Sequence, residues 1–223
     1  MNPISKAEEN HLKAIFTLCE ESDKPASTNA IAKIMKTKAA SVTAMIIRLS
    51  GKEPSLVNHQ KHKGVRLTKA GKKLATNLIR KHRLWETFLV EKLNFSWDEV
   101  HDIAEELEHI KAEKLIDRLD DFLGRPKFDP HGDPIPDAEG NFTFRKQILL
   151  TELVENQTAV VVGVLDDSPS FLQYLNKLNL VLGAKVQVLE RVEYDGSNRI
   201  LLNDQQEQIL TNKVCQNLYV KTL

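Results

Sequence analysis

The segment VHDIAEELEHI, residues 100–110, repeats histidine and glutamate at the spacing of helical turns. On a helix of about 100° per residue, Glu105, Glu108 and His109 fall close to His101, so the four side chains share an arc of roughly 100°. A helix normally keeps its apolar stripe on such an arc. This face is therefore either solvated or built for a ligand that prefers carboxylates and imidazoles.

A second helical segment, RKHRLWE, places His82 and Glu86 one turn apart on one face. If the two helices pack as neighbours, three carboxylates and three imidazoles converge. A set of N and O ligands without thiolate suits Mn²⁺ or Fe²⁺, whereas structural zinc usually takes four closed ligands, often cysteine. Taken singly, His82 would more often be a solvated histidine and Glu105 a surface charge. The combined set favours metal ligation.

The elements before these helices predict a winged helix-turn-helix. Ser5 and Glu8 form a capping-box spacing that opens a helix over 5–21. A second helix starts at Ser27 or Thr28, a third capped by Thr37 covers 38–50, and alternating apolar residues predict a β-hairpin over 55–67.

The rest of the chain predicts helices and then strands. Helices are expected over 68–93, 97–109 and 111–123, followed by a Pro- and Gly-rich loop. Several short strands after residue 150 suggest a small β-barrel. The predicted fold is mainly α with a small β domain. Its domains are a winged helix-turn-helix (1–73), a helical metal-binding and dimerisation domain (74–140) and an SH3-like barrel (150–223).

The charge is unevenly distributed although the net charge is zero. Residues 33–83 contain 14 Lys or Arg and one acid, whereas residues 84–140 contain 6 Lys or Arg and 16 acids. One module is therefore suited to a polyanion and the next to cations.

The basic module predicts binding to double-stranded DNA. Recognition helices enter the major groove by their N-terminal residues, and a basic wing contacts phosphates. The alternative is a solvated lysine-rich surface. The candidate DNA-binding residues lie on the third helix and the hairpin: Thr37, Lys38, Ala40, Ser41, Thr43, Ala44, Arg48, Lys61, Lys63 and Arg66.

Several other classes of protein are disfavoured. The longest apolar run, AVVVGVL, is too short to cross a membrane, and the N-terminus resembles no signal peptide. Two isolated cysteines, Cys19 and Cys215, indicate reduced thiols and a cytoplasmic location. No zinc-protease, P-loop or Rossmann motif occurs, so we expect neither catalysis nor a small organic substrate.

The order of the winged helix, RKHRLWE, VHDIAEELEHI, DPHGDPIP and a small barrel resembles the diphtheria toxin repressor family of metal-dependent transcriptional repressors. The resemblance implies a homodimer that binds palindromic operators when loaded with Mn²⁺ or Fe²⁺ and controls metal-uptake genes. Zn²⁺ or other divalent ions are expected to substitute in vitro. The C-terminal segment is similar to the SH3-like module of ferrous-transport accessory proteins.

The resemblance also implies ligand positions. His82, Glu86 and His101 match the family's ancillary site, and Glu105, Glu108 and His109 its primary site, with Asn10 at the position of the ligand from the first helix. Iron-responsive members have a cysteine at the position of Glu105, whereas manganese-responsive members have a glutamate there, as here. The manganese branch uses a further glutamate where this chain has Lys13. Asp166 and Asp167 lie near the position of two additional ligands.

Two rival functions and one structural choice stay open. The rivals are a metal-buffering protein and a winged-helix regulator that responds to an organic ligand. An apolar stripe predicts the dimer interface, although such stripes also form plain core; it comprises Leu84, Trp85, Phe88, Leu89, Leu115 and Leu119.

Overall fold

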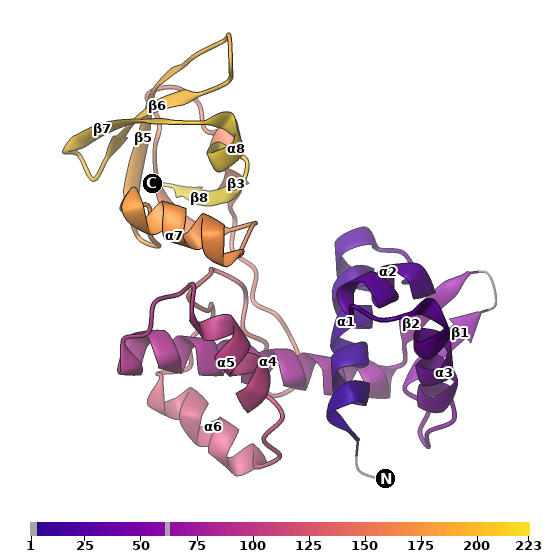
Figure 1. The fold of residues 1–223 in the computed structure, drawn as a ribbon. Helices are drawn as coiled ribbons and strands as arrows, with labels where there is room; N and C mark the ends of the chain where they lie inside the picture. Colours follow the sequence, from indigo (N-terminus) through magenta and orange to yellow (C-terminus); the bar gives the residue numbers. More distant parts are fainter. Residues whose placement is uncertain (1–3, 61–62) are drawn as a thin grey trace. The chain divides into compact units, whose positions relative to one another are not determined.

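The computed structural model describes residues 4–60 and 63–223, drawn as a ribbon in Figure 1. The chain divides into two compact units. The first unit contains the residues up to His82 together with Glu106–Ile116 and Pro136–Phe142, and the second contains Arg83–Glu105, Asp117–Ile135 and Thr143–Leu223. The division into three domains, at the boundaries given above, stays a prediction.

The first unit contains the expected helix-turn-helix and hairpin. Its elements are α1 (Lys6–Ser22), α2 (Thr28–Ile34), α3 (Ala39–Ser50), β1 (Val57–Gln60), β2 (Gly64–Leu67) and the first half of α4 (Lys69–Leu93). The two strands pair antiparallel. The capping box of Ser5 with Glu8 is present, and Ser27 caps α2 through the backbone N–H of Ala30. The N-cap of α3 is Lys38 rather than Thr37 and forms no side-chain cap.

One apolar core holds the first unit together. The buried faces of α1, α2 and α3 meet the inner side of the hairpin through Leu12, Ile15, Ile31, Ile46 and Val65, all with at most 1% of their surface exposed. Burying each such side chain contributes roughly 1.5–3 kcal/mol. The orientation of α3 is therefore fixed by its packing on α1, α2 and the hairpin.

The helix that carries the opening segment is shorter than predicted. α5 covers Val100–Leu107, not 97–109, and α6 covers Glu113–Phe122. After α5 the N–H of Ile110 bonds to the carbonyl of Leu107, which closes a tight turn. Glu108 and His109 lie in this turn. As a result Glu108 is fully buried while the side chain of Glu105 is 45% exposed, so the two do not share the predicted helical face.

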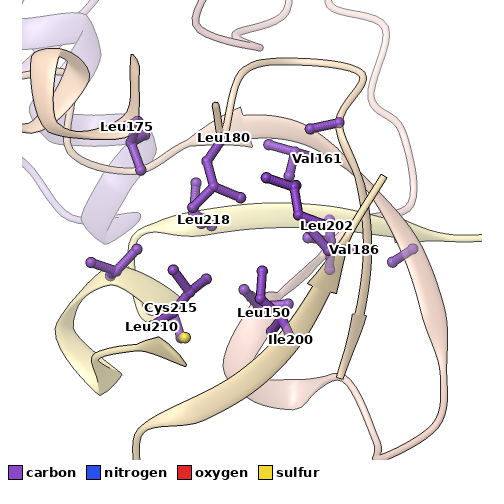
Figure 2. Packing of buried hydrophobic residues seen from close by; sticks show 14 of the residues in the cluster. Leu150, Val161, Leu175, Leu180, Val186, Ile200, Leu202, Leu210, Cys215 and Leu218 are labelled. Carbon is purple, nitrogen blue, oxygen red and sulfur yellow. The ribbon is translucent and has the colours of Figure 1, made fainter. Parts of the chain in front are cut away.

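The C-terminal part of the second unit is a six-stranded antiparallel sheet in the order β3-β8-β4-β5-β6-β7. The sheet's strands are β3 (Ile148–Leu149), β4 (Thr158–Val164), β5 (Lys185–Arg191), β6 (Asn198–Leu202), β7 (Gln206–Leu210) and β8 (Leu218–Thr222), with α7 (Pro169–Lys177) and α8 (Asn212–Cys215) between them. Their alternating inward residues form one buried cluster with α7, including Val161, Leu175, Val186, Ile200 and Leu218 (Figure 2). This sheet confirms the predicted C-terminal β domain.

No helix among the described residues is both long and apolar enough to cross a lipid bilayer.

Candidate metal centre and DNA-binding surface

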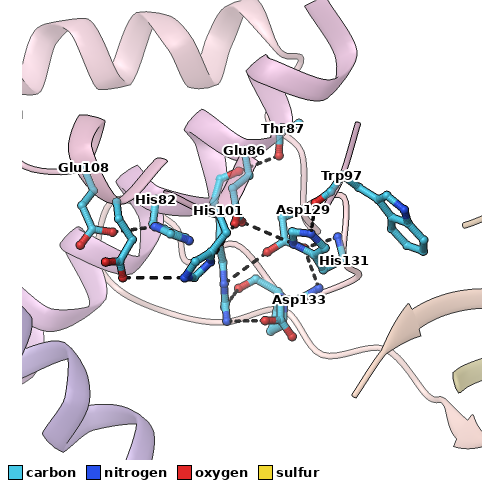
Figure 3. A network of polar contacts seen from close by, with 12 residues as sticks. His82, Glu86, Thr87, Trp97, His101, Glu108, Asp129, His131 and Asp133 are labelled. Carbon is cyan, nitrogen blue, oxygen red and sulfur yellow. Dashed lines mark hydrogen bonds and ion pairs between the residues drawn. The ribbon is translucent and has the colours of Figure 1, made fainter. Parts of the chain in front are cut away.

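Glu108 is the centre of a buried polar cluster in the first unit. Its Oε2 atom accepts hydrogen bonds from Nδ1 of His82 and from Nζ of Lys13, both at 2.7 Å (the His82 contact is drawn in Figure 3). Burial alone would raise the pKa of Glu108, but the hydrogen bond from His82 and the charge of Lys13 hold that pKa below its ordinary value. Glu108 is therefore an ionised carboxylate inside the protein.

The first turn of α1 adds two polar side chains. Oε2 of Glu9 lies 2.6 Å from Nδ1 of His109, whose Nε2 lies 3.8 Å from Oε1 of Glu108. Two buried oxygens, Oδ1 of Asn10 and Oε1 of Glu108, have no hydrogen-bond partner within the described part of the chain. Buried oxygens without donors are costly, and hard divalent cations prefer such oxygen ligands. The residues present thus fit a divalent metal ion.

A second cluster surrounds Glu86 in the second unit. Oε1 of Glu86 lies 3.5 Å from Nδ1 of His101, and Nε2 of the same ring lies 3.9 Å from Oε1 of Glu105 (Figure 3). Glu86 is 2% exposed, whereas the His101 and Glu105 side chains are about half-exposed. His82 precedes Glu86 by one turn of α4. A buried carboxylate thus meets the imidazole of His101, which reaches toward solvent.

Two residues of this cluster were missed by the sequence analysis, which assigned DPHGDPIP to a loop. Glu86, Asp129 and His131 are buried, and each offers one ligand atom within 4.8 Å of the others. His131 is oriented by a 2.8 Å contact between its Nε2 and the carbonyl of Trp97, which leaves Nδ1 on the side of Glu86 (Figure 3). The available signal was DPHGD itself, in which a histidine lies between two aspartates.

The electrostatics of this loop are those of a cation site. Burial and the carboxylates of Glu86 and Asp133 raise the pKa of Asp129 to about 7. Burial opposes protonation of His131, but the hydrogen bond and charge of Glu86 outweigh it and raise the pKa of His131 to about 9. Arg83 lies 3.5 Å from Asp129 and 2.9 Å from Asp133. In this loop, bound protons and the guanidinium of Arg83 compensate the negative charge of the buried carboxylates. A metal ion could replace those protons.

The two aspartates near the position of the additional ligands differ in their surroundings. Oδ1 of Asp166 accepts from the backbone N–H of Ser168 and so serves the turn before α7. Asp167 lines a cavity of about 230 Å³ together with His101 and Asp102. Of the two, Asp167 is placed to reach a ligand near His101.

The candidate DNA-binding residues on α3 and immediately before it lie on its solvent face. Val42, Ile46 and Leu49 point into the core, while the opposite face is exposed, including Thr37, Lys38, Ala40, Ser41, Thr43, Ala44 and Arg48. Nε of Arg48 lies 3.0 Å from Oε1 of Glu8, so this arginine also ties α3 to α1. In the wing Lys63 is exposed and Arg66 is 2.6 Å from the carbonyl of Asp23. Lys61 lies outside the described residues.

The predicted dimer stripe divides into core and surface. Leu84, Leu89 and Leu119 are buried within the single chain, whereas Leu115 is 43% exposed. Trp85 and Phe88 are half-buried and pack edge to face. Only part of the stripe is therefore available to a second subunit.

Three family models together match most of the chain. A model for the N-terminal DNA-binding domain of iron-dependent repressors matches residues 4–65. A model for their metal-binding and dimerisation domain matches residues 68–137, and a FeoA domain model matches residues 148–222.

Individual proteins show the same similarity. The iron-dependent repressor IdeR of Mycobacterium leprae is 30% identical over 200 residues, which cover 84% of this chain and 86% of that protein. A probable metal transport system membrane protein of Chlamydia trachomatis is 46% identical over 70 residues, 31% of this chain but only 16% of that protein. A solved manganese-dependent transcriptional repressor in complex with manganese superposes with a TM-score of 0.85 at 34% identity, covering 97% of this chain and all of that one.

Proposed function

The chain belongs to the diphtheria toxin repressor family of metal-dependent transcriptional repressors, and we propose that it binds palindromic operators as a homodimer when loaded with Mn²⁺, thereby controlling metal-uptake genes. Such a repressor acts in the cytoplasm, where the DNA is. Repression requires only binding to the operator, so we assign no catalytic step. One observation carries the proposal. Glu9 and Asn10 lie in the same unit as the buried carboxylate of Glu108, on helix α1, and α1 packs against α3, the proposed recognition helix.

Two groups of residues are proposed to hold metal. The first, within the first unit, comprises Glu9, Asn10, His82, Glu108 and His109. The second, within the second unit, comprises Glu86, His101, Glu105, Asp129 and His131. Both contain only nitrogen and oxygen ligands, which favours manganese over softer ions, and the similarity to a repressor solved with manganese supports the same choice. Fe²⁺ is the alternative.

The mechanism follows from the position of α1. The carboxylates of Glu9 and Glu108 would hold the metal ion, whose positive charge would compensate theirs. Glu8, on the same turn, lies 3.0 Å from both Arg48 and Lys52 at the end of α3. A displacement of α1 therefore moves α3. DNA accepts paired recognition helices only about 34 Å apart or at a multiple of that spacing. Metal and operator thus strengthen each other's binding, typically by 1–3 kcal/mol.

The test is operator-library binding by the chelator-stripped protein, with Mn²⁺, anaerobic Fe²⁺ and Zn²⁺ added back separately. We expect selection of a palindrome only with metal, and at the lowest free concentration with Mn²⁺. Glu108→Gln should abolish the metal response, whereas Glu106→Gln, an exposed neighbour, should keep it. Metal-independent binding by the wild type, or a wild-type response in Glu108→Gln, would refute the proposal and revive an organic ligand as effector.

A further inference from the structure

Lys13 places a positive charge inside the first ligand group. It lies on α1, and its Nζ is 2.7 Å from Oε2 of Glu108 and 3.3 Å from Nδ1 of His82. The residues that it joins are 95 positions apart in the chain, so the contact is a product of the tertiary fold. No other ammonium is recorded within 4.0 Å of Glu108 among the described residues.

A cation at this place has a clear electrostatic reason. The Glu108 side chain has no exposed surface, and a buried carboxylate without compensation is strongly destabilising. Lys13 provides that compensation in the absence of metal. On Glu108 its hydrogen bond goes to Oε2, while Oε1 has no hydrogen-bond partner within the described part of the chain. A coordination position on Glu108 therefore stays open.

Lys13 is also able to leave. Its side chain is 20% exposed, and a lysine ammonium sits on a flexible four-carbon stem. A dication on Glu108 would lie a few ångströms from the ammonium, and like charges at so short a distance inside a protein repel strongly. Entry of the metal thus requires the ammonium to swing toward water.

We propose that Lys13 is a built-in counter-cation of the metal centre: its ammonium replaces the metal on Glu108 in the metal-free repressor and raises the metal concentration at which the repressor loads. This inference rests on the proposed function, since it presumes that Glu108 is a ligand. It adds a residue that sets the threshold of the response without binding the metal.

The test compares Lys13→Met, which keeps the length of the stem but removes the charge, with wild type and with Lys114→Met, an exposed control on α6. In chelator-stripped protein, Lys13→Met should lower the thermal unfolding midpoint, because the buried carboxylate of Glu108 loses the ammonium and keeps only the hydrogen bond from His82. In Mn²⁺ titrations followed by calorimetry, the same variant should bind at least about tenfold more tightly. Lys114→Met should change neither quantity.

Two further variants keep the test decisive. Lys13→Gln retains a hydrogen-bond donor for Glu108 without the charge and should shift metal affinity in the same direction, and Lys13→Arg should stay near wild type. Unchanged or weaker Mn²⁺ affinity in both neutral variants would overturn the inference. A wild-type protein that binds no divalent metal would instead overturn the proposed function, so the two failures are distinguishable.

Discussion

Oε2 of Glu9 and Nδ1 of His109 lie 2.6 Å apart, and this contact joins the first turn of α1 to the turn that follows α5. Glu9 was not among the ligands expected from the sequence, which placed Asn10 at the position of the ligand from the first helix. Its position gives the first ligand group a carboxylate from α1, which the neutral amide of Asn10 does not supply.

Glu9→Gln should therefore weaken Mn²⁺ binding by at least about tenfold, whether Glu9 is a ligand or orients His109. Glu21→Gln, an exposed glutamate at the other end of α1, is the matched control. Isothermal titration calorimetry with Mn²⁺ measures the effect. Equal affinities in both variants would show that Glu9 has no part in the centre.

Asp129→Asn should remove one metal ion per chain. The amide keeps the shape of the side chain but loses the charge that, with Glu86, faces His131. Asp133→Asn, in the same loop but with a 56% exposed carboxylate, serves as control. Metal content after dialysis, measured by mass spectrometry, should fall from two ions to one in Asp129→Asn alone. Two ions retained in that variant would contradict a second centre.

Glu8 should make stability depend on pH in the acid range. Burial opposes its ionisation, but the backbone N–H of Ser5 and the ammonium of Lys52 prevail and hold the pKa of Glu8 below its ordinary value. Because the folded-state pKa is the lower one, Glu8 contributes stability above its unfolded pKa of about 4.3 and loses that contribution as pH falls through the folded value.

Glu8→Gln should thus unfold at a lower denaturant concentration than wild type at pH 7, and the difference should shrink below about pH 4. Urea titrations at several pH values measure both quantities. Because Glu8 also contacts Arg48 of α3, operator affinity at saturating Mn²⁺ should fall in parallel. A difference in stability that is the same at pH 7 and pH 3 would exclude the ionised form of Glu8 as its cause.

Lys63 in the wing should contribute affinity without sequence preference. Lys63→Ala removes one phosphate-contacting charge, so the slope of log affinity against log salt should decrease by about 1 on operator and non-operator DNA alike. Lys114→Ala provides an exposed lysine outside the hairpin for comparison. A loss confined to the operator would instead assign Lys63 to base recognition.

The sequence by itself determined the elements that depend on neighbours along the chain. His82 and Glu86 share a helix face because a helix repeats every 3.6 residues, and the cap at Ser5 and the antiparallel hairpin follow from equally local rules. The charge contrast between residues 33–83 and 84–140 was likewise readable without coordinates.

Only the tertiary structure decided which distant groups meet. A tight turn ends α5 at Leu107, which buries Glu108 and leaves Glu105 at the surface, against the helical projection. Lys13 reaches Glu108, and a loop brings Asp129 and His131 to Glu86. Such contacts depend on how whole apolar faces pack, so no periodicity along the chain encodes them.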